Sequence, residues 1–168
     1  PMRRLWYTED ELANIKLPRY IIDGVIVFGE TTVIFGPSDA GKTFIVVDMV
    51  MRTAQHYPIM YVAGEDMPGV KLRKLAWQQH YQRPINGQFR MWNAQFSLFD
   101  QEQVDEFILQ NRAAESKIII FDTLSQCALG ADENSNTDMA IVMNNANRIA
   151  HEVGAAVIII HHTTKQET

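Results

Sequence analysis

The sequence predicts an α/β domain: a mostly parallel sheet with helices on both of its faces. Short apolar runs of strand length alternate along the chain with longer stretches of helical periodicity. The runs are apolar throughout rather than alternating with polar residues, which is typical of strands buried on both faces. At 168 residues, 46% hydrophobic and 21% charged, the chain has the composition of one globular domain. Residues 31–168 would form this domain, and residues 1–30 a lead-in packed on it.

Each element has a local signal. Strands are expected at 31–35, 59–63, 89–92, 117–121 and 155–160. Helices are expected to begin at Lys42, near Pro68, near Asp100 and at a cap provided by Thr137 or Ser135, the last of them ending at Gly154. In the lead-in, Thr8 and Glu11 have the spacing of a capping box, and residues 20–27 form a short extended or turn segment.

Two helices have apolar faces that predict their packing. The first should turn one set of residues toward the sheet: Phe44, Val47, Val50, Met51 and Ala54. The second should use a moderately apolar set: Val70, Leu72, Leu75, Ala76 and Gln79. The basic residues of that second helix are expected to form a solvated face, the alternative being contact with DNA or with the nucleotide of a neighbouring subunit: Lys71, Arg73 and Lys74.

Bulk properties exclude several classes of protein. No apolar run approaches the roughly 20 residues needed to span a bilayer, and no leader pattern precedes the domain, so we expect a cytoplasmic protein without membrane association. Cys127 is the single cysteine, which excludes an internal disulfide and a cysteine-rich metal site. The net charge of −5 argues against a basic surface covering the whole molecule, but not against a local basic loop or a ring that gathers a few cations.

The strongest motif is G-P-S-D-A-G-K-T at residues 36–43, a phosphate-binding loop between a strand and a helix. Glycines let backbone N–H groups curl around a phosphate, and the helix N-terminus adds its positive dipole end. Lys42 would reach the β- and γ-phosphates, and the Thr43 hydroxyl would bind Mg²⁺. The loop therefore predicts that the chain binds a nucleoside triphosphate together with Mg²⁺. The expected nucleotide-binding residues are Gly36, Pro37, Ser38, Asp39, Ala40, Gly41, Lys42, Thr43 and Phe44.

Acidic side chains follow two other strands. Asp122 comes directly after a buried strand and fits a Walker B acid that holds Mg²⁺ opposite Thr43; the alternative is a turn or helix cap. Glu65 also ends an apolar strand and could orient or deprotonate the water that attacks the γ-phosphate. Asp66 is the alternative for this task, although it could instead cap the next helix.

The last strand ends in His161 and His162. Adjacent side chains on a strand point to opposite faces, so the two histidines would not ligate one metal ion without a bend. A sensor that detects the γ-phosphate is the favoured role, and which histidine performs it stays open, as does a purely structural role for one of them.

Taken in order, these motifs resemble those of the RecA-like ATPases. They are the phosphate loop, Y-V-A-G-E-D at 61–66, I-I-I-F-D-T-L-S at 118–125, D-E-N-S at 132–135 and I-I-I-H-H-T-T-K at 158–165. G-E-D, D-T-L and H-H-x-x-K resemble in particular the RepA-type hexameric replicative helicases of plasmids and phages. The resemblance implies a RecA-like core that hydrolyses Mg²⁺–ATP in a homohexameric ring and moves along single-stranded DNA.

By position, the resemblance makes Glu65 the water-activating acid, Asp122 the Walker B acid, and His161 or His162 the sensor. In the relatives, an arginine from the next subunit and a main DNA-binding loop lie beyond the H-H strand. We therefore expect the domain to be truncated at its C-terminus and, as a fragment, to be only weakly active.

Two other functions remain open. The chain could be a RecA-like ATPase that is not a helicase, such as a recombination mediator, a loader or a regulatory switch, and its acidic charge favours this mildly. It could also be a P-loop kinase, but such an enzyme needs an arginine-bearing lid, and no Arg-rich segment follows the third strand.

Overall fold

The computed structural model describes residues 6–64, 66–84 and 88–163. At its centre lies a five-stranded sheet in the order β3-β7-β6-β4-β5, in which every neighbouring pair is parallel. The strands are β3 (Thr31–Pro37), β4 (Ile59–Ala63), β5 (Phe89–Met91), β6 (Ile118–Asp122) and β7 (Ala156–Thr163). The predicted α/β architecture with a parallel sheet is confirmed.

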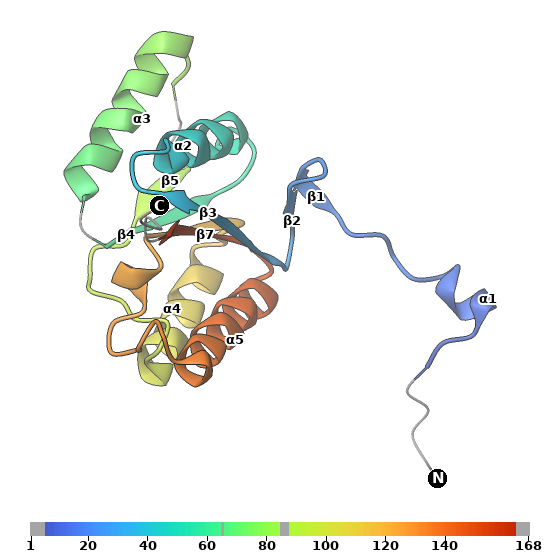
Figure 1. Cartoon of the computed structure of the whole chain (residues 1–168). Helices are drawn as coiled ribbons and strands as arrows, with labels where there is room; N and C mark the ends of the chain where they lie inside the picture. The colour runs from blue at the N-terminus through green and yellow to red at the C-terminus, as the bar shows by residue number, and fades with distance from the viewer. Residues whose placement is uncertain (1–5, 65, 85–87, 164–168) are drawn as a thin grey trace.

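Helices cover both faces of this sheet (Figure 1). α2 (Lys42–Thr53) and α3 (Met67–Tyr81) lie on one face, and α4 (Gln101–Ala113) and α5 (Asn136–Val153) lie on the other. The strands serve both layers because successive side chains point to opposite faces. In β6, for example, Ile118 and Ile120 belong to the core beneath α2 and α3, whereas Ile119 and Phe121 belong to the core beneath α4 and α5.

The strand pairing brings the carboxyl ends of four strands to one edge. Gly36 of β3 lies beside His162 of β7, and Asp122 of β6 lies beside Ala63 of β4. β6 and β7 are themselves neighbours, with Asp122 opposite Ile160. The phosphate loop after β3, Asp122 at the end of β6 and His162 near the end of β7 therefore meet at this edge, which is where ligands bind in open α/β sheets.

The helix ends are fixed by local hydrogen bonds. The Asp100 side chain caps α4 by accepting from the N–H groups of Glu102 and Gln103. Ser135, rather than Thr137, caps α5 through the Asp138 N–H at 3.2 Å. Gly154 ends α5 in the left-handed conformation, as predicted. Within the described residues, no helix is long and apolar enough to cross a membrane.

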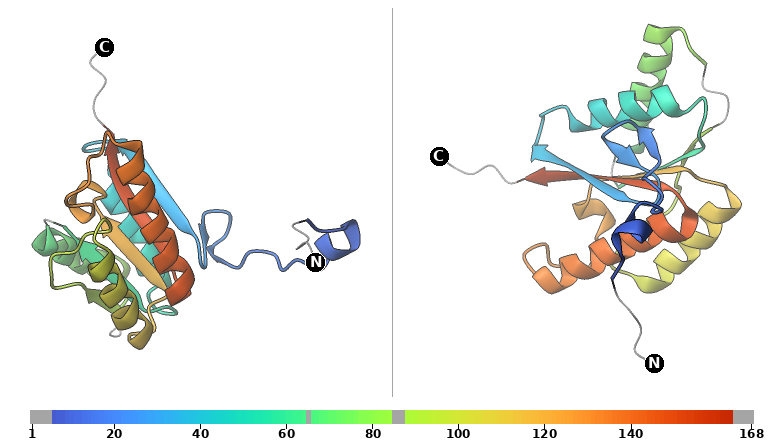
Figure 2. Two further views of the ribbon diagram at one scale, coloured as in Figure 1. Left: turned by 90° about the horizontal axis from the view of Figure 1, so that it is seen from below. Right: turned by 90° about the vertical axis from the view of Figure 1, so that its right-hand side faces the viewer.

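The described part of the lead-in has two sections. α1 (Glu9–Leu12) begins with the predicted capping box, in which the Thr8 N–H donates to Glu11 Oε2 at 2.8 Å. β1 (Tyr20–Ile22) and β2 (Ile26–Val27) form an antiparallel hairpin, and Ile26 is buried in the core beneath α2 and α3. The hairpin is the section that contacts the core, whereas the residues before it project away from the sheet (Figures 1 and 2).

Two predicted helix faces differ from the structure. Phe44 is 64% exposed instead of facing the sheet, because it lies in the first turn of α2 beside the phosphate loop. In α3 the buried residues are Val70 and Trp77, while Leu72 is 66% exposed. α3 packs against α2, and the Trp77 indole N–H donates to Asp48 Oδ1 of that helix at 2.9 Å. The bulky indole of Trp77 determines which side of α3 is buried, and the leucines of this helix are exposed to solvent.

The packing of α3 leads to a stability prediction. Replacing Trp77 by Ala should lower the free energy of unfolding by about 3–5 kcal/mol, because it opens a cavity and removes the hydrogen bond to Asp48. The matched control, Leu72→Ala, should change it by no more than about 0.5 kcal/mol because that side chain is exposed. Urea denaturation measures both values. A larger loss for Leu72→Ala than for Trp77→Ala would contradict the observed face of α3.

Candidate functional site

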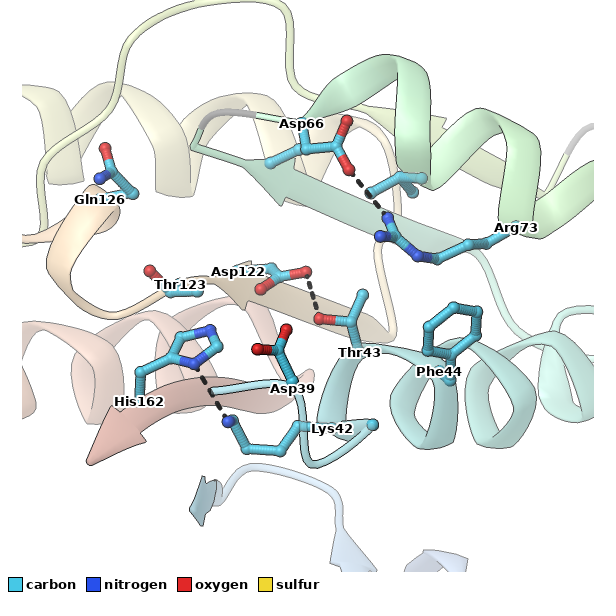
Figure 3. Close-up of a pocket in the computed structure, with 13 residues that line it drawn as sticks. Asp39, Lys42, Thr43, Phe44, Asp66, Arg73, Asp122, Thr123, Gln126 and His162 are labelled. Atoms are coloured by element: carbon cyan, nitrogen blue, oxygen red, sulfur yellow. Dashed lines mark hydrogen bonds and ion pairs between the residues drawn. The ribbon is translucent and has the colours of Figure 1, made fainter. Parts of the chain in front are cut away.

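A cavity of about 340 Å³ opens at the carboxyl edge of the sheet. Its walls come from the phosphate loop, the ends of β4, β6 and β7, and the first turns of α3 (Figure 3). Several predicted site residues line it: Asp39, Gly41, Lys42, Thr43, Phe44, Asp122 and His162. The convergence expected from the strand ends is therefore present in the fold.

The loop leaves the N-terminus of α2 open toward this cavity. Gly41 is the N-cap and has φ +79°, a left-handed conformation that glycine adopts without strain. Because Gly41 has no side chain to cap the helix, the first N–H groups of α2 receive no side-chain acceptor. Uncapped N–H groups at the positive end of the helix dipole form a ready site for an anion.

Lys42 places a buried positive charge in the same loop. Its side chain is almost fully enclosed, and its Nζ donates to the carbonyl oxygens of Gly36 at 2.8 Å and Pro37 at 2.7 Å. A third contact, 3.1 Å long, joins Nζ to His162 Nδ1. A buried ammonium group requires such acceptors, and here they hold it at the loop that would receive a phosphate.

Asp122 and Thr43 face each other across the cavity floor. Thr43 Oγ1 donates to Asp122 Oδ2 at 3.2 Å, and the Tyr61 hydroxyl donates to the same oxygen at 2.6 Å. Burial, together with the negative charge of Asp122, raises the pKa of the Tyr61 phenol. The peptide bond between Asp122 and Thr123 is cis.

The hydroxyl of Thr43 and the carboxylate of Asp122 are oxygen donors of the kind that Mg²⁺ prefers. In the described part of the chain, no three His, Cys, Asp or Glu side chains form a cluster that could hold a metal by themselves. A cation beside Thr43 and Asp122 would therefore need further oxygens, and nucleotide phosphates can provide them. The donor set fits Mg²⁺ that arrives with a nucleotide.

Of the two candidate histidines, only His162 is brought to the loop. Its Nδ1 lies 3.4 Å from Ser38 Oγ as well as 3.1 Å from Lys42 Nζ. His161 points to the opposite face of β7, as the alternation along a strand requires. Its Nδ1 is buried and has no hydrogen-bond partner among the described residues. A role as sensor therefore fits the position of His162.

Glu65 lies outside the described residues, but its two neighbours are described. Asp66 is the N-cap of α3, where its carboxylate accepts from the Gly69 N–H at 2.8 Å. It also forms an ion pair with Arg73 at 3.0 Å. The hydrogen bond from Arg73, followed by that from Gly69, lowers the pKa of Asp66. The carboxylate of Asp66 is thus occupied with holding α3.

Position 64 requires a glycine because the side chain of Gln126 lies very close to its backbone. A Cβ atom on this residue would lie 2.1 Å from the Cβ of Gln126, which belongs to a short 3₁₀ helix, η1 (Ser125–Cys127). Gly64 therefore passes directly over the turn that follows Asp122. This contact explains the glycine of the G-E-D motif in steric terms.

Sequence reasoning missed four residues around the site. They are Tyr61, Arg73, Thr123 and Gln126, of which the last three line the cavity. The expectation that Arg73 lies on a solvated face is wrong: its guanidinium points to the site, pairs with Asp66 and lies 5.2 Å from the centre of the Phe44 ring. The sequence feature that could have predicted this position is the spacing of Arg73 from Val70 and Trp77, which places all three residues on one side of α3.

The comparisons with known proteins agree with this geometry. A model of the AAA domain family matches residues 2–168. The chain belongs to this family. It is a P-loop ATPase domain with a RecA-like core, as the phosphate loop and the parallel sheet indicated.

Two curated proteins are similar over most of the domain. The DNA repair protein RadA of Salmonella typhimurium (strain LT2) and the protein of the same name from Escherichia coli (strain K12) are each 21% identical to it. Both matches extend over 162 residues and cover 89% of this chain. The chain spans about one third of the length of these relatives, 33% in each case.

The contact between Gly64 and Gln126 leads to a second prediction. Gly64→Ala should lower the free energy of unfolding by about 1–3 kcal/mol, because the new methyl group overlaps the Gln126 side chain. Gln126→Gly in the same chain removes the opposing Cβ and should restore part of the loss. Urea denaturation of the two single variants and the double variant measures this coupling. Strictly additive losses would argue against the contact.

Proposed function

We propose that this chain is the ATP-binding, Mg²⁺-dependent, ATP-hydrolysing motor domain of a replicative DNA helicase. The observation that supports it best is the convergence of three groups in one cavity: the Lys42 ammonium group, the Thr43–Asp122 pair and the His162 imidazole. The sequence resemblance to RepA-type helicases supports the choice of a helicase among RecA-like ATPases.

In this proposal the loop binds the phosphates of ATP. The uncapped N–H groups of α2 donate to the phosphate oxygens, and Lys42 exchanges the carbonyl oxygens of Gly36 and Pro37 for the β- and γ-phosphates. Thr43 and Asp122 hold Mg²⁺, whose charge offsets the negative charge on the phosphates when it is bound. Phe44 and Arg73 border the cavity and add an apolar ring and a second cation to the nucleotide site.

Glu65 is the proposed residue that orients the attacking water. The main support is that Asp66, the alternative, already caps α3 and pairs with Arg73. In the sequence Glu65 comes two residues after the end of β4, whereas Asp122 ends the neighbouring strand β6, so the proposed water-activating and metal-binding carboxylates belong to different strand ends. This separation is found in RecA-like motors rather than in small-molecule kinases.

His162 is the proposed γ-phosphate sensor. Its ring nitrogen now lies beside Lys42, so a phosphate that draws Lys42 away would also change the partners of His162. Because His162 lies near the end of β7, this change would reach whatever follows the strand.

We further propose that the intact protein assembles as a homohexameric ring around single-stranded DNA. Lys42 and Arg73 are the cations that line the cavity among the described residues. A third cation from the next subunit would complete the site, as in the helicases that the sequence resembles. With a net charge of −5, DNA contacts would depend on basic loops gathered at the ring centre.

A second candidate function has its own support. The curated relatives are DNA repair proteins, and the net negative charge favours a protein without a broad DNA-binding surface. The chain would then be a RecA-like ATPase that remodels or regulates DNA intermediates without acting as a replicative helicase. The nucleotide chemistry would be the same in both cases.

The ATPase rate of the full-length protein tests the proposal. We expect single-stranded DNA to stimulate hydrolysis, and the rate per subunit to rise with protein concentration as rings form. Unwinding of a forked duplex then separates the helicase from the repair candidate. A rate independent of both DNA and protein concentration would contradict an assembled DNA motor.

Variants of the site separate binding from hydrolysis. Lys42→Ala should reduce ATP turnover about a hundredfold or more, since it removes the charge that contacts the phosphates. Glu65→Gln should keep ATP binding but reduce turnover by about 10²–10⁴-fold. Lys71→Ala, which removes an exposed lysine of α3, is the control and should leave both unchanged. Full turnover in Glu65→Gln would show that another group activates the water.

A further inference from the structure

The Asp122 carboxylate receives a hydrogen bond from a residue that the proposed mechanism does not use. The Tyr61 hydroxyl donates to Asp122 Oδ2 at 2.6 Å, shorter than the 3.2 Å contact from Thr43. Among the described residues, Asp122 Oδ1 accepts no hydrogen bond from a protein group. Tyr61 therefore anchors the carboxylate through one oxygen and leaves the other without a protein partner in the described chain.

The strand pairing explains why a tyrosine is found at this position. Tyr61 lies opposite Ile120 and Ala63 lies opposite Asp122, so Tyr61 and Asp122 are diagonal neighbours on the same face of the sheet. Diagonal neighbours are separated by a distance that an aromatic side chain can span and a short one cannot. The small side chain of Ala63, directly beside Asp122, leaves room for the phenol to reach the carboxylate.

The tyrosine ring has little freedom to move. Tyr61 is fully buried in the core beneath α2 and α3, and its ring centre lies 5.8 Å from that of Phe89. From this fixed ring the hydroxyl donates to Asp122 Oδ2 at 2.6 Å. The carboxylate is thus held by a donor on a rigid, buried side chain.

We propose that Tyr61 is a positioning residue that fixes the Asp122 carboxylate for the Mg²⁺ ion bound with the nucleotide, an inference that rests on the proposed ATPase site. Residues that hydrogen-bond to a metal ligand orient it and lower the entropy lost on binding, and their removal typically weakens metal binding about 10–100-fold. Tyr61 acts through Asp122 and does not itself contact nucleotide or metal.

The alternative is that the hydrogen bond only satisfies a buried hydroxyl. A purely structural tyrosine would affect unfolding but not the magnesium dependence of nucleotide binding. The two possibilities therefore differ in a measurement that does not depend on catalytic turnover.

The test is the variant Tyr61→Phe in the full-length protein, with a fluorescent ATP analogue as the probe. In EDTA, we expect the variant to bind the analogue with the same affinity as the wild type. The Mg²⁺ concentration that gives half of the magnesium-dependent increase in affinity should rise on the order of tenfold. Tyr57→Phe is the matched control, because it also removes a hydroxyl from a packed tyrosine ring. The Tyr57 ring packs against Phe28, with 5.3 Å between the ring centres, and it lies away from Asp122. Its magnesium dependence should stay that of the wild type.

A double-mutant cycle with Asp122→Asn makes the test specific. If Tyr61 acts through Asp122, removing its hydroxyl should have little further effect on magnesium dependence once the carboxylate is gone. An unchanged magnesium dependence in Tyr61→Phe, or equal effects with and without the Asp122 carboxylate, would overturn the assignment. Failure of the wild type to bind the analogue, or to bind it more tightly with Mg²⁺, would instead overturn the proposed ATPase site on which it rests.

Discussion

Every contact in the candidate site depends on the shared direction of the five strands. In a parallel sheet the carboxyl ends of neighbouring strands meet at one edge, so a polar residue placed after each strand is delivered to the same cavity. Here Gly36, Asp122 and His162 come from three adjacent strands, and their pairing puts them within reach of Lys42 and Thr43. One antiparallel strand in this group would carry its end residue to the far edge. The site is thus a consequence of the topology more than of any single contact.

The ammonium group of Lys42 links the loop to the last strand. Its present acceptors are two backbone carbonyls and one imidazole nitrogen, all uncharged groups or weak bases, within a mostly enclosed environment. A phosphate oxygen carries negative charge and forms a stronger, charge-assisted hydrogen bond in the same surroundings. In the proposed site, binding of a phosphate would therefore compete directly with the contact to His162, and this would make β7 responsive to the occupancy of the loop. Such coupling would need no movement of the sheet, because both residues lie at its edge.

The parts of the molecule that the sequence predicted are those with local signals. The strands are uninterrupted apolar runs, and the loop motif fixes glycines, a lysine and a hydroxyl at set spacing. The sequence alone therefore predicted that Lys42, Thr43 and Asp122 would meet at the cavity. Tyr61 and Arg73 were not found, because their roles depend on which strand pairs with β6 and on how α3 rotates against α2. The apolar residues of α3 suggested the wrong rotation, since leucines at 72 and 75 outnumber the one indole that determines the packing. The choice between His161 and His162 likewise required the face of β7 that meets the loop.

Gly64 and Asp66, which flank the proposed catalytic Glu65 in the sequence, each make a specific contact. Gly64 passes over the turn that follows Asp122, at a distance that admits no side chain, and Asp66 caps α3 while pairing with Arg73. These contacts tie the end of β4 to the turn after Asp122, and they tie the first turn of α3 to Arg73. Because α3 carries Arg73 into the cavity, a nucleotide bound there as proposed would contact α3 directly, and this contact would link hydrolysis to the position of the helix. Both candidate functions, helicase and repair ATPase, require a link of this kind between nucleotide chemistry and movement.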